Sequence, residues 1–445
     1  MSRHRGQADF LVHATSEAEV GWQVASATLE DGWSRRAAVI SSPKSNTLHT
    51  SIQLAVIGGG PAGLRAAEVA AAGGVRVTVF DAQPSVGRKL LVAGKGGLNL
   101  TNSEQFEHFA TRYTGPGQPA GIWHDLLREF DADALRAWAS GLGVATFQAS
   151  NNRVYPQALK AAPLLRRWVE RLRRMGVGFA VNHRLTGIEP GAPHRLVFAT
   201  GEVVSAEAVV FALGGASWPQ TGSDGAWTGW FKTLGIDCHA LVAANCGWRH
   251  PWPPEVLASA DGQPLKNIHA SVSNHHVTSE LLITRYGLEG GAIYQLGPAL
   301  RGMLEPAITI DLKPTFTHAQ LVAKMESVRR DFLDAARVRW RLGTAAHTLL
   351  ARRVWHDAGA LAREVKHCVI PLDGPQPVAE AISTAGGVCW HELDGGLMVT
   401  RYPGVFVAGE MIDWEAPTGG YLLQGCFATG TRAGRSAAAW LQSGD

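Results

Sequence analysis

The stretch that decides the fold is Leu54-Ala55-Val56-Ile57-Gly58-Gly59-Gly60-Pro61-Ala62-Gly63. Its apolar start is typical of a parallel strand that is buried on both faces. The glycines at positions 58, 60 and 63 then satisfy the pattern G-x-G-x-x-G. The first allows a tight turn, the second lets a pyrophosphate approach the backbone, and the third lets helix and strand pack closely. Because Pro61 and the alanine-rich residues 64–72 favour a helix, we predict a strand, a turn and a helix in succession.

A second apolar run at residues 75–80 predicts the next strand, and Asp81 follows it, 18 residues after Gly63. An acid at this position accepts hydrogen bonds from a ribose. Strand, glycines, helix, strand and acid in register predict a dinucleotide site. Its candidate residues are Gly58, Gly60, Pro61, Ala62, Gly63, Asp81 and Ala82.

A glycine-rich segment at residues 87–102 favours a flavoprotein over a dehydrogenase. It contains the adjacent cations Arg88 and Lys89, and Asn99 lies near its end. Such a loop wraps a diphosphate and brings backbone donors toward a flavin ring. The alternative is an ordinary solvated loop. We take Arg88, Lys89 and Asn99 as cofactor-binding candidates.

Two later strands also end in glycine turns. Residues 208–215 form an apolar run that closes on paired glycines, and residues 405–410 form another that closes on Gly409 and Glu410. An acid at a strand end binds ribityl hydroxyls. An apparent helix then runs from Gly419 to Ala428, and its N-terminus favours negative charge on a reduced flavin. The candidates are Leu213, Gly214, Gly215, Gly409, Glu410, Gly419, Gly420, Tyr421 and Leu422.

Taken in order, these motifs resemble the aminoacetone oxidase family of FAD-binding enzymes, to which bile-acid 3-dehydro-Δ4,6-reductases also belong. Residues 153–156, 280–290 and 384–388 extend the resemblance over about 52 to 440. The resemblance implies an α/β protein, with a glutathione-reductase-like FAD-binding Rossmann domain, an inserted β-rich plus helical domain and non-covalent FAD. Many relatives carry Arg-Cys where this chain has Gly97-Leu98, so any role of that cysteine is not available here.

The spacing of the motifs predicts the domain organisation. Residues 52–240 and 376–445 form the FAD-binding domain, and residues 241–375 loop out between its halves as a substrate or cap domain. Within this insert, residues 268–283 predict short strands and residues 320–363 show helical spacing. The remaining residues, 1–51, are expected to be a poorly ordered extension without chemistry.

Composition excludes several classes of protein. The net charge of +3 is too small to argue for nucleic acid, and no apolar run is long enough for a membrane span. The five cysteines contain no C-x-x-C pair, which excludes a redox-active dithiol and favours a cytoplasmic protein. Metal-ligand spacing is also missing, so no metal is expected. Of the 15 tryptophans, five lie at residues 218–252 after the Gly214 turn and Trp414 lies near Glu410, where core packing and the lining of a substrate pocket are both open interpretations.

We predict an FAD-dependent oxidoreductase that transfers a hydride between flavin N5 and a small or medium organic substrate. NAD(P)H as a transient reductant is one version, although only one complete dinucleotide fingerprint is visible. An amine or alcohol oxidase that uses oxygen is an alternative. The basic residues 324–353 leave open a flavin-dependent RNA-modifying or RNA-binding protein, but we do not expect nucleic acid because they lack the aromatic platform of single-strand binding. The catalytic acid or base is not assigned among Lys95, Tyr155, His391 and Tyr421, and the oligomeric state is left open.

Overall fold

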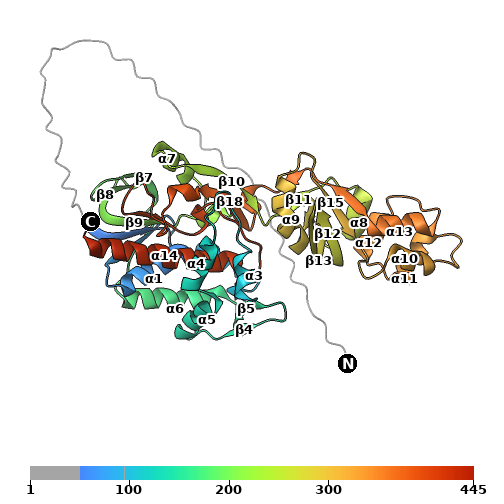
Figure 1. Cartoon of the computed structure of the whole chain (residues 1–445), viewed down its shortest axis with the longest axis horizontal. Coiled ribbons are helices and arrows are strands. Elements are labelled where there is room, and N and C mark those ends of the chain that lie inside the picture. Colours follow the sequence, from blue (N-terminus) through green and yellow to red (C-terminus); the bar gives the residue numbers. More distant parts are fainter. Residues whose placement is uncertain (1–50, 95, 445) are drawn as a thin grey trace, which may run out of the picture. The chain divides into compact units, whose positions relative to one another are not determined.

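The computed structural model describes residues 51–94 and 96–444, and all structural statements below concern this part of the chain (Figure 1). The prediction for residues 1–51 falls almost entirely outside it, as does the acid–base candidate Lys95. Among the described residues, no helix is both long and apolar enough to cross a membrane.

The main sheet brings the turns of the sequence motifs together at the carboxyl ends of its parallel strands. Its order is β6-β2-β1-β9-β8-β7, with β19 also paired to β9. Its parallel strands are β1 (Ser51–Ile57), β2 (Val77–Asp81), β6 (Gly178–Val181), β9 (Val203–Phe211) and β19 (Val405–Val407). Two antiparallel strands, β7 (Leu185–Glu189) and β8 (His194–Phe198), extend it. Ile57 lies opposite both Phe80 and Phe211, and Val407 also lies opposite Phe211. The turns after β1, β2, β9 and β19 therefore leave the same edge.

Helix α1 (Pro61–Ala72) packs along the C-terminal helix α14 (Tyr421–Ser443). A Cβ added at Gly430 or Gly434 would lie 2.4 Å from the carbonyl oxygen of Ala62 or Ala66, so only glycine allows this approach. The predicted end of the last helix at Ala428 was too early, because small and apolar residues continue its buried face. Shorter helices complete this part: α2 (Arg88–Ala93), α3 (Phe106–Ala110), α4 (Ile122–Glu129), α5 (Ala132–Gly141), α6 (Ala161–Arg174) and α7 (Trp227–Thr233).

A three-stranded sheet lies in the same part of the chain and consists of β3 (Thr101–Asn102), β4 (Thr146–Gln148) and β5 (Arg153–Pro156). The segment 87–102 is thus not a continuous loop as predicted. Arg88 and Lys89 begin the short helix α2, and the segment ends in β3.

The middle of the chain builds a second sheet whose strand pairs are all antiparallel, in the order β16-β15-β12-β13-β14-β11-β17. Its strands are β11 (Trp248–Arg249), β12 (Pro264–Val272), β13 (His275–Thr284), β14 (Gly287–Glu289), β15 (Ala307–Asp311), β16 (Cys368–Pro371) and β17 (Gly374–Pro375). The helices are α8 (Pro254–Ala260), α9 (Gly291–Arg301), α10 (His318–Ala323), α11 (Phe332–Arg339), α12 (Thr344–Leu350) and α13 (Ala358–Lys366). Strands β10 (Cys238–Ala244) and β18 (Ser383–Val388) flank this sheet in the sequence, and they pair with each other as antiparallel neighbours.

Residues 320–363 have the predicted helical content but not one continuous face. Asp331 and Arg341 adopt left-handed backbone with φ of 53° and 52°, and the segment breaks into short helices around them. Leu321 in α10 and Trp340 directly after α11 are both buried, although they belong to different helices.

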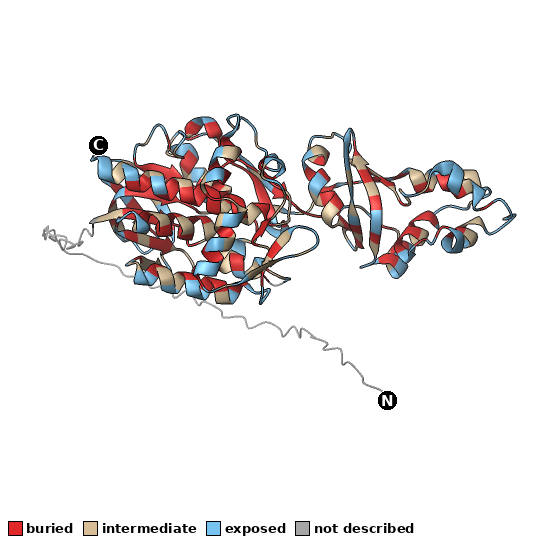
Figure 2. Cartoon of the chain, turned by 60° about the horizontal axis from the view of Figure 1, so that its bottom comes forward, coloured by how far each residue is buried: buried red, intermediate tan, exposed pale blue. Residues whose placement is uncertain are grey.

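Two large hydrophobic cores and one small cluster, formed by Ala243, Cys246 and Ala381, divide the buried apolar side chains of the described residues (Figure 2). One draws its buried side chains from residues 54–236 and 388–438, and the other draws them from residues 248–372. We therefore keep 241–375 as a proposed insert into the first unit.

Candidate functional site

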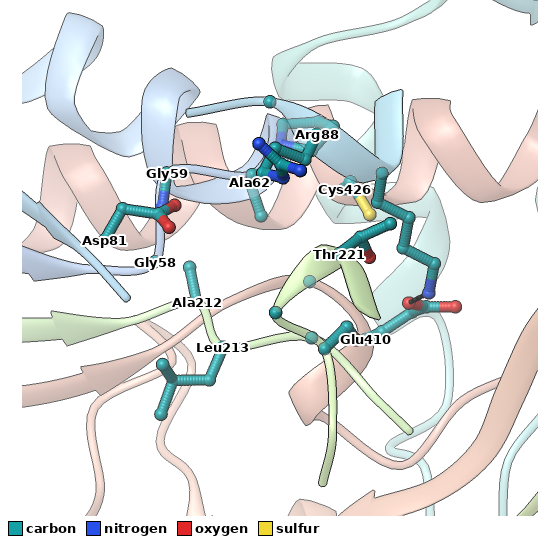
Figure 3. A pocket seen from close by; sticks show the side chains of 18 of the residues that line it. Gly58, Gly59, Ala62, Asp81, Arg88, Ala212, Leu213, Thr221, Glu410 and Cys426 are labelled. Carbon is teal, nitrogen blue, oxygen red and sulfur yellow. Dashed lines mark hydrogen bonds and ion pairs between the residues drawn. The ribbon is translucent and has the colours of Figure 1, made fainter. Parts of the chain in front are cut away.

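A groove runs along the edge where the parallel strands end (Figure 3). Predicted residues from three distant parts of the sequence line it together: Gly58, Gly60, Pro61, Ala62, Asp81, Ala82, Arg88, Lys89, Leu213, Gly214, Gly409 and Glu410. Asp81 and Glu410 lie at opposite ends of the view. An elongated ligand fits such an arrangement better than a compact one.

The three glycines of the first motif have different neighbours. Gly58 has a φ of +108°, and a Cβ there would lie 2.3 Å from the carbonyl oxygen of Ala212. A Cβ at Gly63 would lie 2.0 Å from the carbonyl oxygen of Gly58. At Gly60 a Cβ would meet nothing within 4 Å, although this residue lines the groove. The outer glycines therefore permit packing, and the middle one leaves space over the backbone.

Asp81 is fixed at one end of the groove by two backbone donors. Its Oδ2 accepts a hydrogen bond from Gly59 N at 2.9 Å, and its Oδ1 accepts one from Gln83 N at 2.8 Å. Burial raises the pKa of this carboxyl group, and the two backbone hydrogen bonds oppose the rise. The carboxylate can still accept further hydrogen bonds, because each oxygen has two lone pairs.

An ion pair marks the other end of the groove. Lys89 Nζ lies 2.7 Å from Glu410 Oε2 and also donates to Ser217 Oγ at 2.7 Å. Glu410 Oε1 accepts a longer hydrogen bond from Thr384 N at 3.4 Å. Cys426 lines the groove nearby, and burial raises the pKa of its thiol to about 12, so it is protonated at neutral pH.

The remaining predicted residues lie outside this lining. Gly63 and Gly215 are packing positions, since a Cβ at Gly215 would lie 2.4 Å from Thr384 Oγ1. The others gather around β3 and the start of α14, and they are Asn99, Gly419, Gly420, Tyr421 and Leu422. Asn102 Nδ2 donates to Gly419 O at 3.3 Å across this junction.

Near that junction the structure leaves two buried polar atoms unpaired. Asn99 Oδ1 and Thr101 Oγ1 have no hydrogen-bond partner among the described residues. Tyr421, in contrast, has a partner for its hydroxyl, which donates to Glu104 Oε1 at 2.7 Å, and for its carbonyl, which accepts from Tyr113. Buried unpaired atoms beside a glycine turn are consistent with a bound group.

Sequence reasoning missed part of the lining, namely Gly59, Gly87, Ala212, Thr221, Gly222, Ser223, Ala408 and Cys426. Gly59 and Gly87 lie inside the motifs and were within reach of prediction. Residues 221–223 carry no motif, and they reach the groove through the turn that follows Gly214.

None of the acid–base candidates in the described part lines the groove. Tyr155 stacks on Phe147 with ring centroids 5.8 Å apart, and Tyr421 is held by Glu104. His391 is a surface residue that hydrogen-bonds Asp237 at 3.2 Å. Asp237, His391 and Glu392 place one ligand atom each within 4.8 Å of one another, but Glu392 already accepts from Asp237 N. We propose no metal role for this group.

The tryptophans near the glycine turns support those turns from the core. Trp227 Nε1 donates to Gly214 O, and Trp414 Nε1 donates to Gly409 O, each at 2.8 Å. Trp248 and Trp252 are buried in the second core. Core packing is therefore the correct interpretation for these four residues.

A second cavity of about 580 Å³ lies beside the loop that precedes α14. Its volume is within the range of about 300–1,000 Å³ that is usual for ligand pockets. Its lining comes from residues before α4, from the end of β10, from β13 and α9, and from the loop after Glu410: Thr111, Arg112, Thr114, Asn245, His275, Tyr294, Gln295, Pro298, Ala299, Glu415, Ala416 and Pro417.

Comparison with known proteins agrees with the geometry. Residues 52–436 match the family described as HI0933-like protein Rossmann domain. The chain is 26% identical to a 3-dehydro-bile acid delta(4,6)-reductase of Clostridium scindens, over 87% of this chain and 99% of that protein. It is 23% identical to a ribosomal RNA dihydrouridine synthase of Escherichia coli, over 83% of this chain and 94% of that protein.

Among solved structures, 3-ketosteroid-delta4-(5alpha)-dehydrogenase of Rhodococcus jostii matches with a TM-score of 0.50 and 18% identity. The match covers 89% of this chain and 98% of that one. At this identity it shows the fold alone. These comparisons confirm the predicted family resemblance and the predicted α/β Rossmann class.

Proposed function

This chain belongs to the HI0933-like Rossmann-domain family, and from this premise we propose that it is an FAD-dependent reductase of a carbon–carbon double bond conjugated to a carbonyl group. The broader class, an FAD-dependent oxidoreductase, follows from the family and the relatives. The groove carries the cofactor part of the proposal, because it joins the dinucleotide turn to Glu410.

The residues around the groove fit FAD. The open space over Gly60 and the N-terminus of α1 suit a pyrophosphate, and Asp81 suits the adenosine ribose. Lys89 and Glu410 would face the ribityl chain, and Asn99 and Gly420 would face the ring. When bound, FAD supplies hydride transfer to and from carbon. The protein supplies position and charge around it.

The reaction class comes from what the two relatives have in common. The names of both describe the saturation of a double bond next to a carbonyl, in a 3-dehydro-Δ4,6 bile acid and in the uracil ring of uridine. We propose the same bond type for this chain, with NAD(P)H as the reductant. Insert residues 241–375 would shape substrate choice. The oxidase alternative has no support in either name.

The reductant is tested by anaerobic titration of the purified protein. We expect NADH or NADPH to bleach the flavin absorbance near 450 nm, and an added conjugated enone to restore it. Bleaching by amines, with no response to either nicotinamide, would instead establish the oxidase alternative.

Replacing Asp81 by Ala is expected to weaken FAD binding. The substitution removes a charge-assisted contact to the ribose, for which about 1.5 to 3 kcal/mol is typical. This corresponds to roughly a 10- to 100-fold rise in the dissociation constant. Titration of the apoprotein with FAD measures it, and unchanged affinity would show that Asp81 does not contact the ribose.

A second candidate substrate is uridine within RNA, and the charge of the insert favours it. Residues 324–353 contain eight Lys or Arg against three Asp or Glu, in a chain whose net charge is only +3. Arg337 and Arg341 are exposed and form no side-chain hydrogen bond or ion pair within the described residues. Such a surface suits a polyanion.

Charge reversal tests this candidate. We expect Arg337→Glu with Arg341→Glu to weaken binding of a fluorescein-labelled RNA hairpin at least about tenfold and to reduce its salt dependence. The matched control is Arg166→Glu with Arg174→Glu, on the exposed basic face of α6. Binding is measured by an anisotropy titration. If the two double variants weakened RNA binding equally, the binding would be nonspecific charge attraction, and RNA would no longer be a candidate substrate.

A further inference from the structure

The cavity of about 580 Å³ beside the loop before α14 has no role so far. Building on the proposed function, we propose that this cavity is the substrate pocket. We further propose that it selects a flat, polar substrate ring carrying its own hydrogen-bond donor, of the pyrimidine type, over an apolar steroid. Its position, its lining and one buried amide carry the inference.

The position links the cavity to the cofactor groove. Residues 415–417 line the cavity and connect Glu410, at the end of the groove, with Gly419 and Gly420. Arg112 also lines the cavity and hydrogen-bonds Glu104, whose carboxylate accepts from Tyr421 at the start of α14. Both connections end at the turn proposed to approach the flavin ring.

The lining offers few of the large apolar side chains that hold a steroid. Apolar ligands are held by aliphatic and aromatic side chains. The twelve described residues that line this cavity include no Leu, Ile, Val, Met, Phe or Trp, and Tyr294 is the single aromatic ring besides His275. Most of the others are hydroxyl, amide or charged side chains, which pair with polar edges.

The charges at the cavity wall are already neutralised. Arg112 binds Glu104 through two nitrogens, at 3.0 and 2.8 Å. Glu415 is paired with Arg301 of α9. A substrate that enters this space therefore meets paired charges and neutral polar groups, which favours an uncharged ring.

Asn245 favours a ligand that carries a hydrogen-bond donor. It is 5% exposed, and its Nδ2 donates to Ser383 Oγ and to Ala416 O, both at 2.8 Å. Its Oδ1 has no partner among the described residues. A buried unpaired oxygen costs about 1–3 kcal/mol, so a ligand N–H at this wall would be favoured. A pyrimidine carries such an N–H between two carbonyls, and a 3-oxo steroid has none.

Tyr294 adds a second acceptor. Its hydroxyl donates to Glu289 Oε1 at 2.8 Å, which leaves the oxygen lone pairs for a ligand donor. Burial and the Glu289 carboxylate raise the pKa of Tyr294, so the hydroxyl stays protonated. Glu289 also accepts from Tyr286 at 2.7 Å, which holds the carboxylate in place.

The experiment measures binding of two probes, uridine and a 3-oxo-4,6-diene steroid, to the FAD-loaded enzyme by isothermal titration calorimetry. We expect uridine to bind and the steroid not to bind. Gln295→Trp, which fills the cavity from an exposed position on α9, should weaken uridine at least tenfold. Tyr294→Phe should weaken it about threefold to tenfold. The control Gln263→Trp, exposed on the insert but outside the cavity, should leave it unchanged.

Chromatography of the cofactor released from the same samples distinguishes a failure of the proposed FAD-dependent function from a failure of the cavity assignment. A wild-type protein that holds no FAD would overturn the proposed function whatever the probes do. With FAD retained, steroid binding stronger than uridine binding, or uridine binding unaffected by Gln295→Trp and Tyr294→Phe alike, would overturn the assignment of this cavity.

Discussion

Replacing Gly60 by Val is expected to leave the chain folded and to abolish its binding of FAD. The backbone at Gly60 is extended, with φ of −78°, so a side chain is tolerated there. A Cβ meets nothing within 4 Å in the protein. It would instead fill the space over the backbone into which the pyrophosphate fits. We expect the dissociation constant for FAD to rise at least about 100-fold, which corresponds to about 2.8 kcal/mol.

Equilibrium titration of the apoprotein with FAD measures this effect, and circular dichroism with thermal unfolding checks the fold. Gly395→Val is the control, because Gly395 is exposed and also has an empty surrounding. If Gly60→Val retained wild-type FAD affinity, the groove would not hold the pyrophosphate. Gly63→Val is its counterpart: its Cβ overlaps the Gly58 carbonyl, and we expect loss of the fold as well.

Replacing Gly420 by Val is expected to destabilise the protein and release the cofactor together. Gly420 has a φ of +101°, and a Cβ there would lie 2.4 Å from the carbonyl carbon of Thr101 in β3. The strained backbone and the overlap with main-chain atoms together predict a loss of about 2 to 5 kcal/mol in the free energy of unfolding. The turn before α14 would have to separate from β3.

Thermal unfolding with and without added FAD is the measurement. Glu410→Gln serves as the comparison, because it keeps the size of the side chain while removing the charge that pairs with Lys89. We expect Gly420→Val to be the worse of the two in both assays. A variant at Gly420 with wild-type stability and FAD content would mean that this turn lies farther from β3 than the structure shows and that it does not hold the flavin as proposed.

The local parts of this structure followed from the sequence. The strand, turn and helix at residues 51–72 depend on residues that are close together in the chain, so their chemistry is readable without tertiary information. The same holds for Asp81 after β2 and for Gly409 and Glu410 after β19. The meeting of these turns also followed, because parallel strands share one carboxyl edge.

Contacts between distant residues did not follow. The pair of Lys89 and Glu410 joins positions 321 apart, and no pattern in either segment indicates it. Asn245 is similar: its neighbours Ser383 and Ala416 are set by the antiparallel pairing of β10 with β18 and by the loop before α14. Residues 320–363 show the limit for helices, since helical spacing did not reveal the left-handed residues Asp331 and Arg341 that divide the segment.

The most direct test is to denature the purified protein and chromatograph the released cofactor, after reconstitution with a mixture of FAD and FMN. We expect one FAD per chain and no FMN, because the groove provides for the adenosine ribose and pyrophosphate as well as for the ribityl end. FMN in place of FAD, or a protein that retains neither, would contradict the assignment of the groove between Asp81 and Glu410.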